Sequence, residues 1–274
     1  MNSLKNYTSD IASRFKQSYD EFIERSVNVR KRDPQDIQKY ILRCRVTGEK
    51  IELIKKFGRD FSGVDFSKMN LAGVGLAKVK LNKANFNLAD LSDMDLTFAQ
   101  FEDASMHFVD LTGAILNNAS LVNVNLELAN LTGAMLIGAN LKNVNLKGAN
   151  LSRANLTDAN LEGANLEGAN LSDAIIVNAV MKNANMALVN FSSASIYESN
   201  FENSTLDNSS FFKAKILYSN FARSKLYNTY FTRADLRGSN FKGSNISDAI
   251  IQNSSLYPEK IDKLSNKILG NIEK

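Results

Sequence analysis

The sequence predicts a mainly β fold, a parallel β-helix (solenoid) of about ten square coils, and three observations lead to it. A large apolar residue recurs at every fifth position, and all forty sites from 61 to 256 are Leu, Ile, Phe or Met. From 64 to 254, the residue two places before each of these sites is always Ala, Ser, Val, Met or Thr. No insertion breaks the register, and self-similarity at a fixed period is typical of a repeat architecture.

A period of five residues fits neither an α-helix nor a flat β-strand. In an α-helix, five residues rotate a side chain by about 140° beyond a full turn, so no single face collects the apolar sites. In a strand, an odd period sends them to alternate faces. If each pentapeptide is instead a short extended segment that ends in a right-angle turn, four of them close a square coil with the large and small residues inside. Residue n then stacks on residue n + 20 at a spacing of about 4.8 Å.

The stretch ANLTDANLEGANLEGANLSDA, Ala154 to Ala174, shows the pattern at its most regular. It resembles the pentapeptide-repeat family, whose pattern is A(D/N)LXX, and the resemblance covers roughly residues 60–257. The resemblance implies a right-handed quadrilateral β-helix, and the handedness rests on it alone. After residue 190, Ser replaces Ala and Phe replaces Leu at many sites, which conserves the core volume. Stacking by twenty predicts two facing columns of rings, Phe201, Phe221 and Phe241 in one and Phe191, Phe211 and Phe231 in the other.

The flanks follow helical patterns and give three predicted domains: a helical N-terminal region or cap over 1–59, the β-helix over 60–257, and a C-terminal capping helix over 258–274. An apolar stripe predicts a first helix over roughly residues 3–26. Asp33-Pro34 predicts a helix start, with Ile37, Tyr40, Ile41 and Cys44 on one face. The segment RVTGEKIELIKKFG fits either a short helix or a hairpin. Both ends of a coil stack have unpaired backbone edges that need such caps.

Charge and composition narrow the setting. The net charge is +4, with 14 Lys and Arg against 8 Asp and Glu in residues 1–59 and 15 against 18 in residues 60–257. The single cysteine excludes an internal disulfide framework. No apolar run is long enough for a transmembrane segment, and the N-terminus lacks a signal-peptide core. We therefore expect a cytoplasmic protein, with secretion into a host cell without a signal peptide as the other route.

The same pattern predicts no enzyme, with no catalytic, cofactor-binding or metal-binding residues. His107 is the only histidine, which excludes a histidine metal cluster within the chain, and it is expected on the surface. Four large and four small side chains fill each coil, so the axis has no room for a substrate.

Two outward stripes of apolar residues suggest contact surfaces, because a contiguous apolar stripe is more than isolated surface residues require. The predicted partner-binding wall comprises Ile115, Met135, Ile137, Ile175, Val177, Tyr197, Leu217 and Tyr257. A second predicted stripe, nearer the N-terminal end, comprises Leu88, Phe108 and Leu128. Covering of one stripe by the N-terminal helices, the second stripe above all, is the alternative explanation.

Three functional hypotheses follow. The first is a non-enzymatic scaffold or binding rod for an unidentified protein partner, or for self-association, with no direct contact to nucleic acid. The second comes from the resemblance, since some family members mimic DNA and protect DNA gyrase, a topoisomerase; acidic columns that alternate with Lys make this partner less favoured here. The third is a secreted bacterial effector that acts on a host protein. The outward residues vary freely within the repeat, so the sequence leaves the partner open.

Overall fold

The computed structural model describes residues 34–255, and the chain divides into two compact units, Met1–Glu49 and Lys50–Lys274. In the first unit, helix α2 spans Pro34–Thr47, with Asp36 in its first turn and Arg45 in its last, where each charge suits the helix dipole. The helix begins at Pro34, as predicted. On the predicted apolar face Ile37, Ile41 and Cys44 are buried, and Tyr40 is half-buried. The helices predicted over 3–26 and 258–274 lie outside the described residues.

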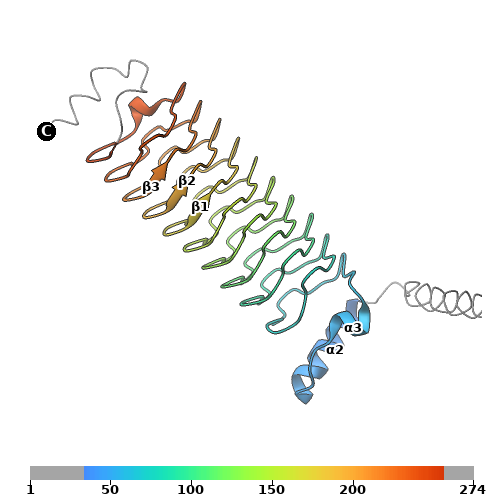
Figure 1. Cartoon of the computed structure of the whole chain (residues 1–274). Coiled ribbons are helices and arrows are strands. Elements are labelled where there is room, and N and C mark those ends of the chain that lie inside the picture. The colour runs from blue at the N-terminus through green and yellow to red at the C-terminus, as the bar shows by residue number, and fades with distance from the viewer. Residues whose placement is uncertain (1–33, 256–274) are drawn as a thin grey trace, which may run out of the picture. The chain divides into compact units, whose positions relative to one another are not determined.

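The second unit begins with a short helix and continues into stacked coils (Figure 1). Helix α3 spans Leu53–Phe57, so the ambiguous segment forms a helix rather than a hairpin. Leu53 is buried, and the Gly58 amide donates to the Ile54 carbonyl at 2.8 Å to close the C-terminal end of the helix. A 3-10 turn, η1, spans Ile246–Asp248 near the last described coil.

Parallel pairing of residue n with residue n + 20 builds the coil stack, as predicted. The bridges run from Asp60 with Lys80 to Asp235 with Ser255. Within them, the Leu161 amide donates to the Val180 carbonyl at 2.6 Å. Because every coil repeats this pairing along its sides, the stack is a β-helix even though most sides are too short to count as strands.

Each side of a coil ends in a tight turn. At a typical corner the Ala164 amide donates to the Leu161 carbonyl at 3.0 Å, and Gly163 between them has φ 69°. A positive φ at the third residue is the signature of a type II turn. Asn and Asp occupy many of the equivalent corner positions, and these two residues tolerate this conformation better than most.

Large side chains at every fifth position fill the interior. All of those described are buried except Phe241, which is half-buried, and the two predicted phenylalanine columns are confirmed. Ring centroids are 4.6 Å apart for Phe201 and Phe221 and 4.6 Å apart for Phe191 and Phe211, with nearly parallel planes. The two columns meet edge to face, for example at 6.1 Å between Phe211 and Phe221. The coil axis is therefore close-packed over this stretch.

One side of three successive coils is extended enough to form true strands: β1 (Ile175–Val177), β2 (Ser195–Tyr197) and β3 (Lys215–Leu217). They pair in parallel in the order β1-β2-β3. The β-branched residues of β1 favour this extended backbone. Figure 1 shows the three arrows on one side of neighbouring coils.

Serine hydroxyls close the corners that follow these strands. The Ala179 amide donates to Ser199 Oγ at 3.2 Å, and that hydroxyl donates to the Ile176 carbonyl at 3.0 Å. The hydroxyl thus bridges the Ala179 amide and the Ile176 carbonyl, which would hydrogen-bond directly to each other in a tight turn. In the same way the Ser199 and Ser219 amides donate to the hydroxyls of Ser219 and Ser239, both at 3.2 Å. We call Ser199, Ser219 and Ser239 the serine ladder. Its serines complete the backbone hydrogen bonding as well as conserve volume.

Candidate protein-binding surface

The face that contains β1, β2 and β3 includes the predicted partner-binding wall, and we call this face the strand wall. One outward column runs through paired residues in successive coils: Asp95, Ile115, Met135, Asn155, Ile175, Ser195, Lys215 and Asp235. A second column two residues further on contains Ile137, Val177 and Tyr197. Met135, Ile175 and Tyr197 are exposed, and Ile115, Ile137 and Val177 are half-buried. The apolar residues gather in the middle coils of the wall.

Leu217 corrects the sequence interpretation, because it is only 9% exposed and does not present an open surface. It pairs with Tyr197 across β2 and β3, and the Tyr197 ring meets the ring of Tyr218 edge to face at 5.5 Å. The two aromatic side chains beside it leave Leu217 little contact with solvent. Tyr257, the last predicted wall residue, lies outside the described residues.

Two exposed aromatic residues at the corner beside the strand wall were missed by the sequence analysis. Phe98 and Tyr218 occupy the same corner column, six coils apart, and both are exposed. Lys78 Nζ lies 6.0 Å from the centre of the Phe98 ring. The signal was available, because each residue directly follows an outward position of the wall. It was overlooked because these two residues lie six coils apart and do not form a contiguous stripe.

The second predicted stripe, Leu88, Phe108 and Leu128, lies on a corner column and all three residues are exposed. Their φ values are 60°, 54° and 57°, so large apolar side chains occupy left-handed backbone at successive corners. Gly148 takes the next position in the column, and a Cβ there would lie 2.8 Å from Leu128 Cδ2. The stripe therefore ends at Gly148, because the Leu128 side chain lies over this glycine. A larger residue at position 148 would displace the Leu128 side chain.

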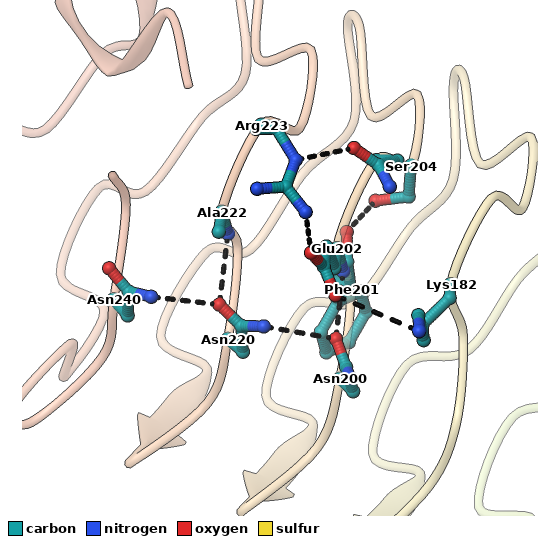
Figure 2. A network of polar contacts seen from close by, with 10 residues as sticks. Lys182, Asn200, Phe201, Glu202, Ser204, Asn220, Ala222, Arg223 and Asn240 are labelled. Atoms are coloured by element: carbon teal, nitrogen blue, oxygen red, sulfur yellow. Dashed lines mark hydrogen bonds and ion pairs between the residues drawn. The ribbon is translucent and has the colours of Figure 1, made fainter. Parts of the chain in front are cut away.

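Polar side chains hold the coils of another face in register (Figure 2). Asn240 Nδ2 donates to Asn220 Oδ1 at 3.0 Å, and Asn220 Nδ2 donates to Asn200 Oδ1 at 3.2 Å. Beside this ladder, Glu202 pairs with Lys182 at 3.8 Å and also with Arg223. Such cross-coil contacts join neighbouring coils on this face between Lys182 and Asn240.

Charge is distributed unevenly along the coils. Residues 84–141 contain seven Asp and Glu and neither Lys nor Arg. Residues 213–242 contain seven Lys and Arg and a single acidic residue, Asp235. Between these segments the predicted alternating columns form ion pairs, Lys142 with Glu162 at 3.2 Å and Lys147 with Glu167 at 3.1 Å. The coil stack is thus acidic over residues 84–141 and basic over residues 213–242.

Two carboxylates of the strand wall are held in their ionised form. Hydrogen bonds from Thr97 lower the pKa of Asp95, with a smaller effect of Lys78. A hydrogen bond from Arg237 lowers the pKa of Asp235, and Arg237 Nη2 lies 2.6 Å from Asp235 Oδ2. Both groups therefore stay charged to a lower pH than an ordinary aspartate.

Replacing Arg237 by glutamine is expected to raise the pKa of Asp235 toward the ordinary aspartate value. Because folding lowers this pKa, the ionised carboxylate stabilises the fold above its unfolded-state pKa, and that contribution disappears as the pH falls through the folded-state pKa. The R237Q variant should lose part of this pH dependence. A carboxyl ¹³C NMR titration measures the shift, with Asp95 as the internal control. An unchanged Asp235 titration would show that Arg237 is not its partner in solution.

Across 34–255, no three His, Cys, Asp or Glu side chains gather where they could hold a metal ion. His107 lies half-buried at the surface, with its ring 4.3 Å from the Phe108 ring and its Nδ1 3.9 Å from Glu127 Oε2. Among these residues no helix is long and apolar enough to cross a bilayer.

The geometry defines a β-solenoid with a filled axis, whose outward side chains are the ones available for contact. Comparison with known families gives its membership. The family model for pentapeptide repeats matches the chain in eight copies, over residues 81–118, 116–148, 149–187, 174–211 and 218–256. The chain belongs to the pentapeptide repeat family.

Two solved structures are similar to this chain. QnrB1, a plasmid-mediated fluoroquinolone resistance protein, is similar with a TM-score of 0.54 and 14% identity, over 71% of this chain and 92% of that one. HetL, a pentapeptide repeat protein involved in heterocyst differentiation regulation in the cyanobacterium Nostoc, aligns with a TM-score of 0.45 and 22% identity, over 80% of this chain and 96% of that one. A comparison with curated proteins gave no match. At 14% identity the likeness to QnrB1 concerns the fold alone.

Proposed function

We propose that this protein is a non-enzymatic binding rod that engages a protein partner through the strand wall. The observation that supports it most is the apolar middle of that wall, where Met135, Ile175 and Tyr197 are exposed beside the half-buried Ile137 and Val177. Exposed apolar side chains that gather on one face of a folded protein mark contact surfaces.

The other faces support the choice by contrast. On the face of the asparagine ladder, Asn220 and Glu202 pair with side chains of neighbouring coils. A partner that binds there would have to compete with those contacts. A partner that binds the strand wall would only displace water from apolar side chains.

A single apolar-to-charged substitution tests the proposal. Ile175→Glu places a charge in the apolar middle of the wall, and we expect it to reduce partner binding by about tenfold or more. Leu188→Glu is the matched control, because Leu188 is an exposed apolar residue of a different corner column. Affinity capture from cell extract, followed by a titration with the captured protein, measures the difference. Equal loss in both variants, or no loss in Ile175→Glu, would contradict the assignment to the wall.

A second candidate function is supported by the acidic segment 84–141. A run of coils with seven carboxylates and no cation could imitate the phosphates of DNA toward a topoisomerase such as DNA gyrase. A gyrase supercoiling assay with a quinolone tests it. Protection of supercoiling, reduced by Asp93→Asn with Asp103→Asn, is the expected result for this function. Neither protection nor inhibition at micromolar protein would remove it.

We also propose that the segments before and after the coils cap the unpaired backbone edges at the two ends of the coil stack. In this assignment residues 1–59 form the N-terminal cap, 60–257 about ten coils, and 258–274 a C-terminal capping helix. Helix α3, with its buried Leu53, supports the N-terminal part of the proposal.

A further inference from the structure

We propose that the strand wall binds a second copy of this chain, with the two coil stacks antiparallel and related by a twofold axis at the level of Asn155. The inference rests on the proposed function, because it names the occupant of the same wall. Its basis is that the outward residues of the wall are complementary to themselves when their order along the stack is reversed.

The geometry of a twofold axis makes this complementarity testable residue by residue. An axis across the wall, perpendicular to the stack, brings each outward column against the same column of the second copy in reverse order. With Asn155 on the axis, coils equally far above and below it face each other. Residues of one column then meet in fixed pairs.

Charges of opposite sign flank the apolar middle of the wall. Asp95 lies three coils before Asn155 in its column and Lys215 three coils after it, so Asp95 of one copy faces Lys215 of the other. On the adjoining corner, Asp93 faces Lys213 in the same way. All four side chains are exposed. Because the axis repeats each pair, four oppositely charged pairs flank the contact.

Between these charges the apolar residues meet each other. Met135 and Ile175 lie one coil on either side of Asn155 in the first column, and Ile137 and Val177 do so in the second. The reversed order places Met135 against Ile175 and Ile137 against Val177. At the next corner the same operation places the exposed ring of Phe98 against that of Tyr218. An apolar centre with a charged rim is the usual anatomy of a protein interface.

Other arrangements lose this match. Moving the axis half a coil toward the C-terminal end sets Asp95 against Asp235, a like-charged residue of the same column. A parallel pair sets Asp95 against Asp95 and Lys215 against Lys215. The antiparallel register brings Arg153 and Asp158 near their own copies, but both are exposed corner residues whose repulsion solvent screens.

Charge reversal across the pair tests the inference with the full chain. The homodimer of Asp95→Lys sets a lysine against Lys215, and that of Lys215→Asp sets Asp95 against an aspartate. We expect each single variant to dimerise about tenfold more weakly, by sedimentation velocity over a micromolar concentration series.

Mixing the two variants is expected to restore the contact. In the mixed dimer the lysine introduced in one copy faces the aspartate introduced in the other, and the unchanged Lys215 faces the unchanged Asp95. An equimolar mixture should therefore regain dimerisation, as should the double variant, in which every pair is reversed. Failure of both to recover would overturn the antiparallel register.

Cross-linking distinguishes the register from a parallel dimer. In a Cys44→Ala background, Ile115→Cys and Ser195→Cys lie in one column, two coils either side of Asn155. A short bismaleimide should join the mixture of the two variants and neither variant alone, since identical positions are about 19 Å apart along the stack. Ala187→Cys, on the opposite face, should remain unlinked. Linking of each variant to itself would indicate a parallel pair and contradict the inference.

The two proposals fail separately. If the wild-type chain stays monomeric throughout the concentration series while Ile175→Glu still loses a captured partner, the wall binds a different protein and the self-association is wrong. If the wild-type chain dimerises and Ile175→Glu dimerises equally well, the self-association uses another surface and the inference is wrong, while the capture experiment with Ile175→Glu still decides the proposed function.

Discussion

Replacing Phe211 by alanine lowers the free energy of unfolding by about 4 kcal/mol, the expected cost of emptying a ring-sized volume in a close-packed core. Phe211 is fully buried, stacked between Phe191 at 4.6 Å and Phe231 at 4.9 Å. It also meets the edge of Phe221. The coils above and below cannot close the gap, because their backbones are joined at a fixed spacing. Denaturant unfolding followed by circular dichroism measures the loss.

The adjacent residue provides the control. Phe212 has the same side chain but is 37% exposed, with Lys213 Nζ 5.2 Å from its ring centre. Phe212→Ala should therefore cost less than about 1 kcal/mol. Similar losses at the two positions would mean that the five-residue register does not decide which ring is inside, which would contradict the fold.

Ser219→Ala is expected to lower the free energy of unfolding by about 2 kcal/mol. Ser219 Oγ accepts the Ser199 amide at 3.2 Å and donates to the Leu217 carbonyl at 3.1 Å. Alanine leaves the buried amide without an acceptor, because the open corner offers no carbonyl in its place. The loss is measured by the same denaturant unfolding, and amide hydrogen exchange at Ser199 should accelerate with it.

Ser209→Ala serves as the matched control for the serine ladder. Ser209 is also buried, but its hydroxyl has no partner within the described residues, and its own amide donates to the Leu206 carbonyl in a tight turn at 3.0 Å. Removing an unpaired buried hydroxyl should leave stability unchanged or raise it slightly. Equal destabilisation at Ser209 and Ser219 would mean that both serines act only by filling space.

The core of this fold follows from the sequence because the repeat determines it. A period of five with a large and a small residue leaves one register, and that register places Phe211 inside and Phe212 outside, as the structure confirms. The serine ladder could not be predicted in this way. Its hydrogen bonds depend on the corner after β1 being open, a backbone detail that the repeat pattern does not encode.

The candidate surface was predictable in outline. Stacking by twenty brought Met135, Ile175 and Val177 to one face, but it gave Leu217 the same exposure as its neighbours. Its burial depends on the side chains of Tyr197 and Tyr218 meeting beside it, and the conformations of such rings are set by packing rather than by periodicity. The cytoplasmic location and the effector hypothesis stay predictions.

The corner after every fifth residue has a consequence for how such a chain tolerates insertions and deletions. Loss of twenty residues removes one whole coil and leaves every later side chain in the same column and on the same face. Loss of five preserves the interior equally well, yet it swings all later residues by a quarter turn. Lys215 would then lie on the adjacent face of the coil stack, and no longer on the face of Asp95. A five-residue deletion that leaves the core packing unchanged would thus alter which side chains share a binding surface.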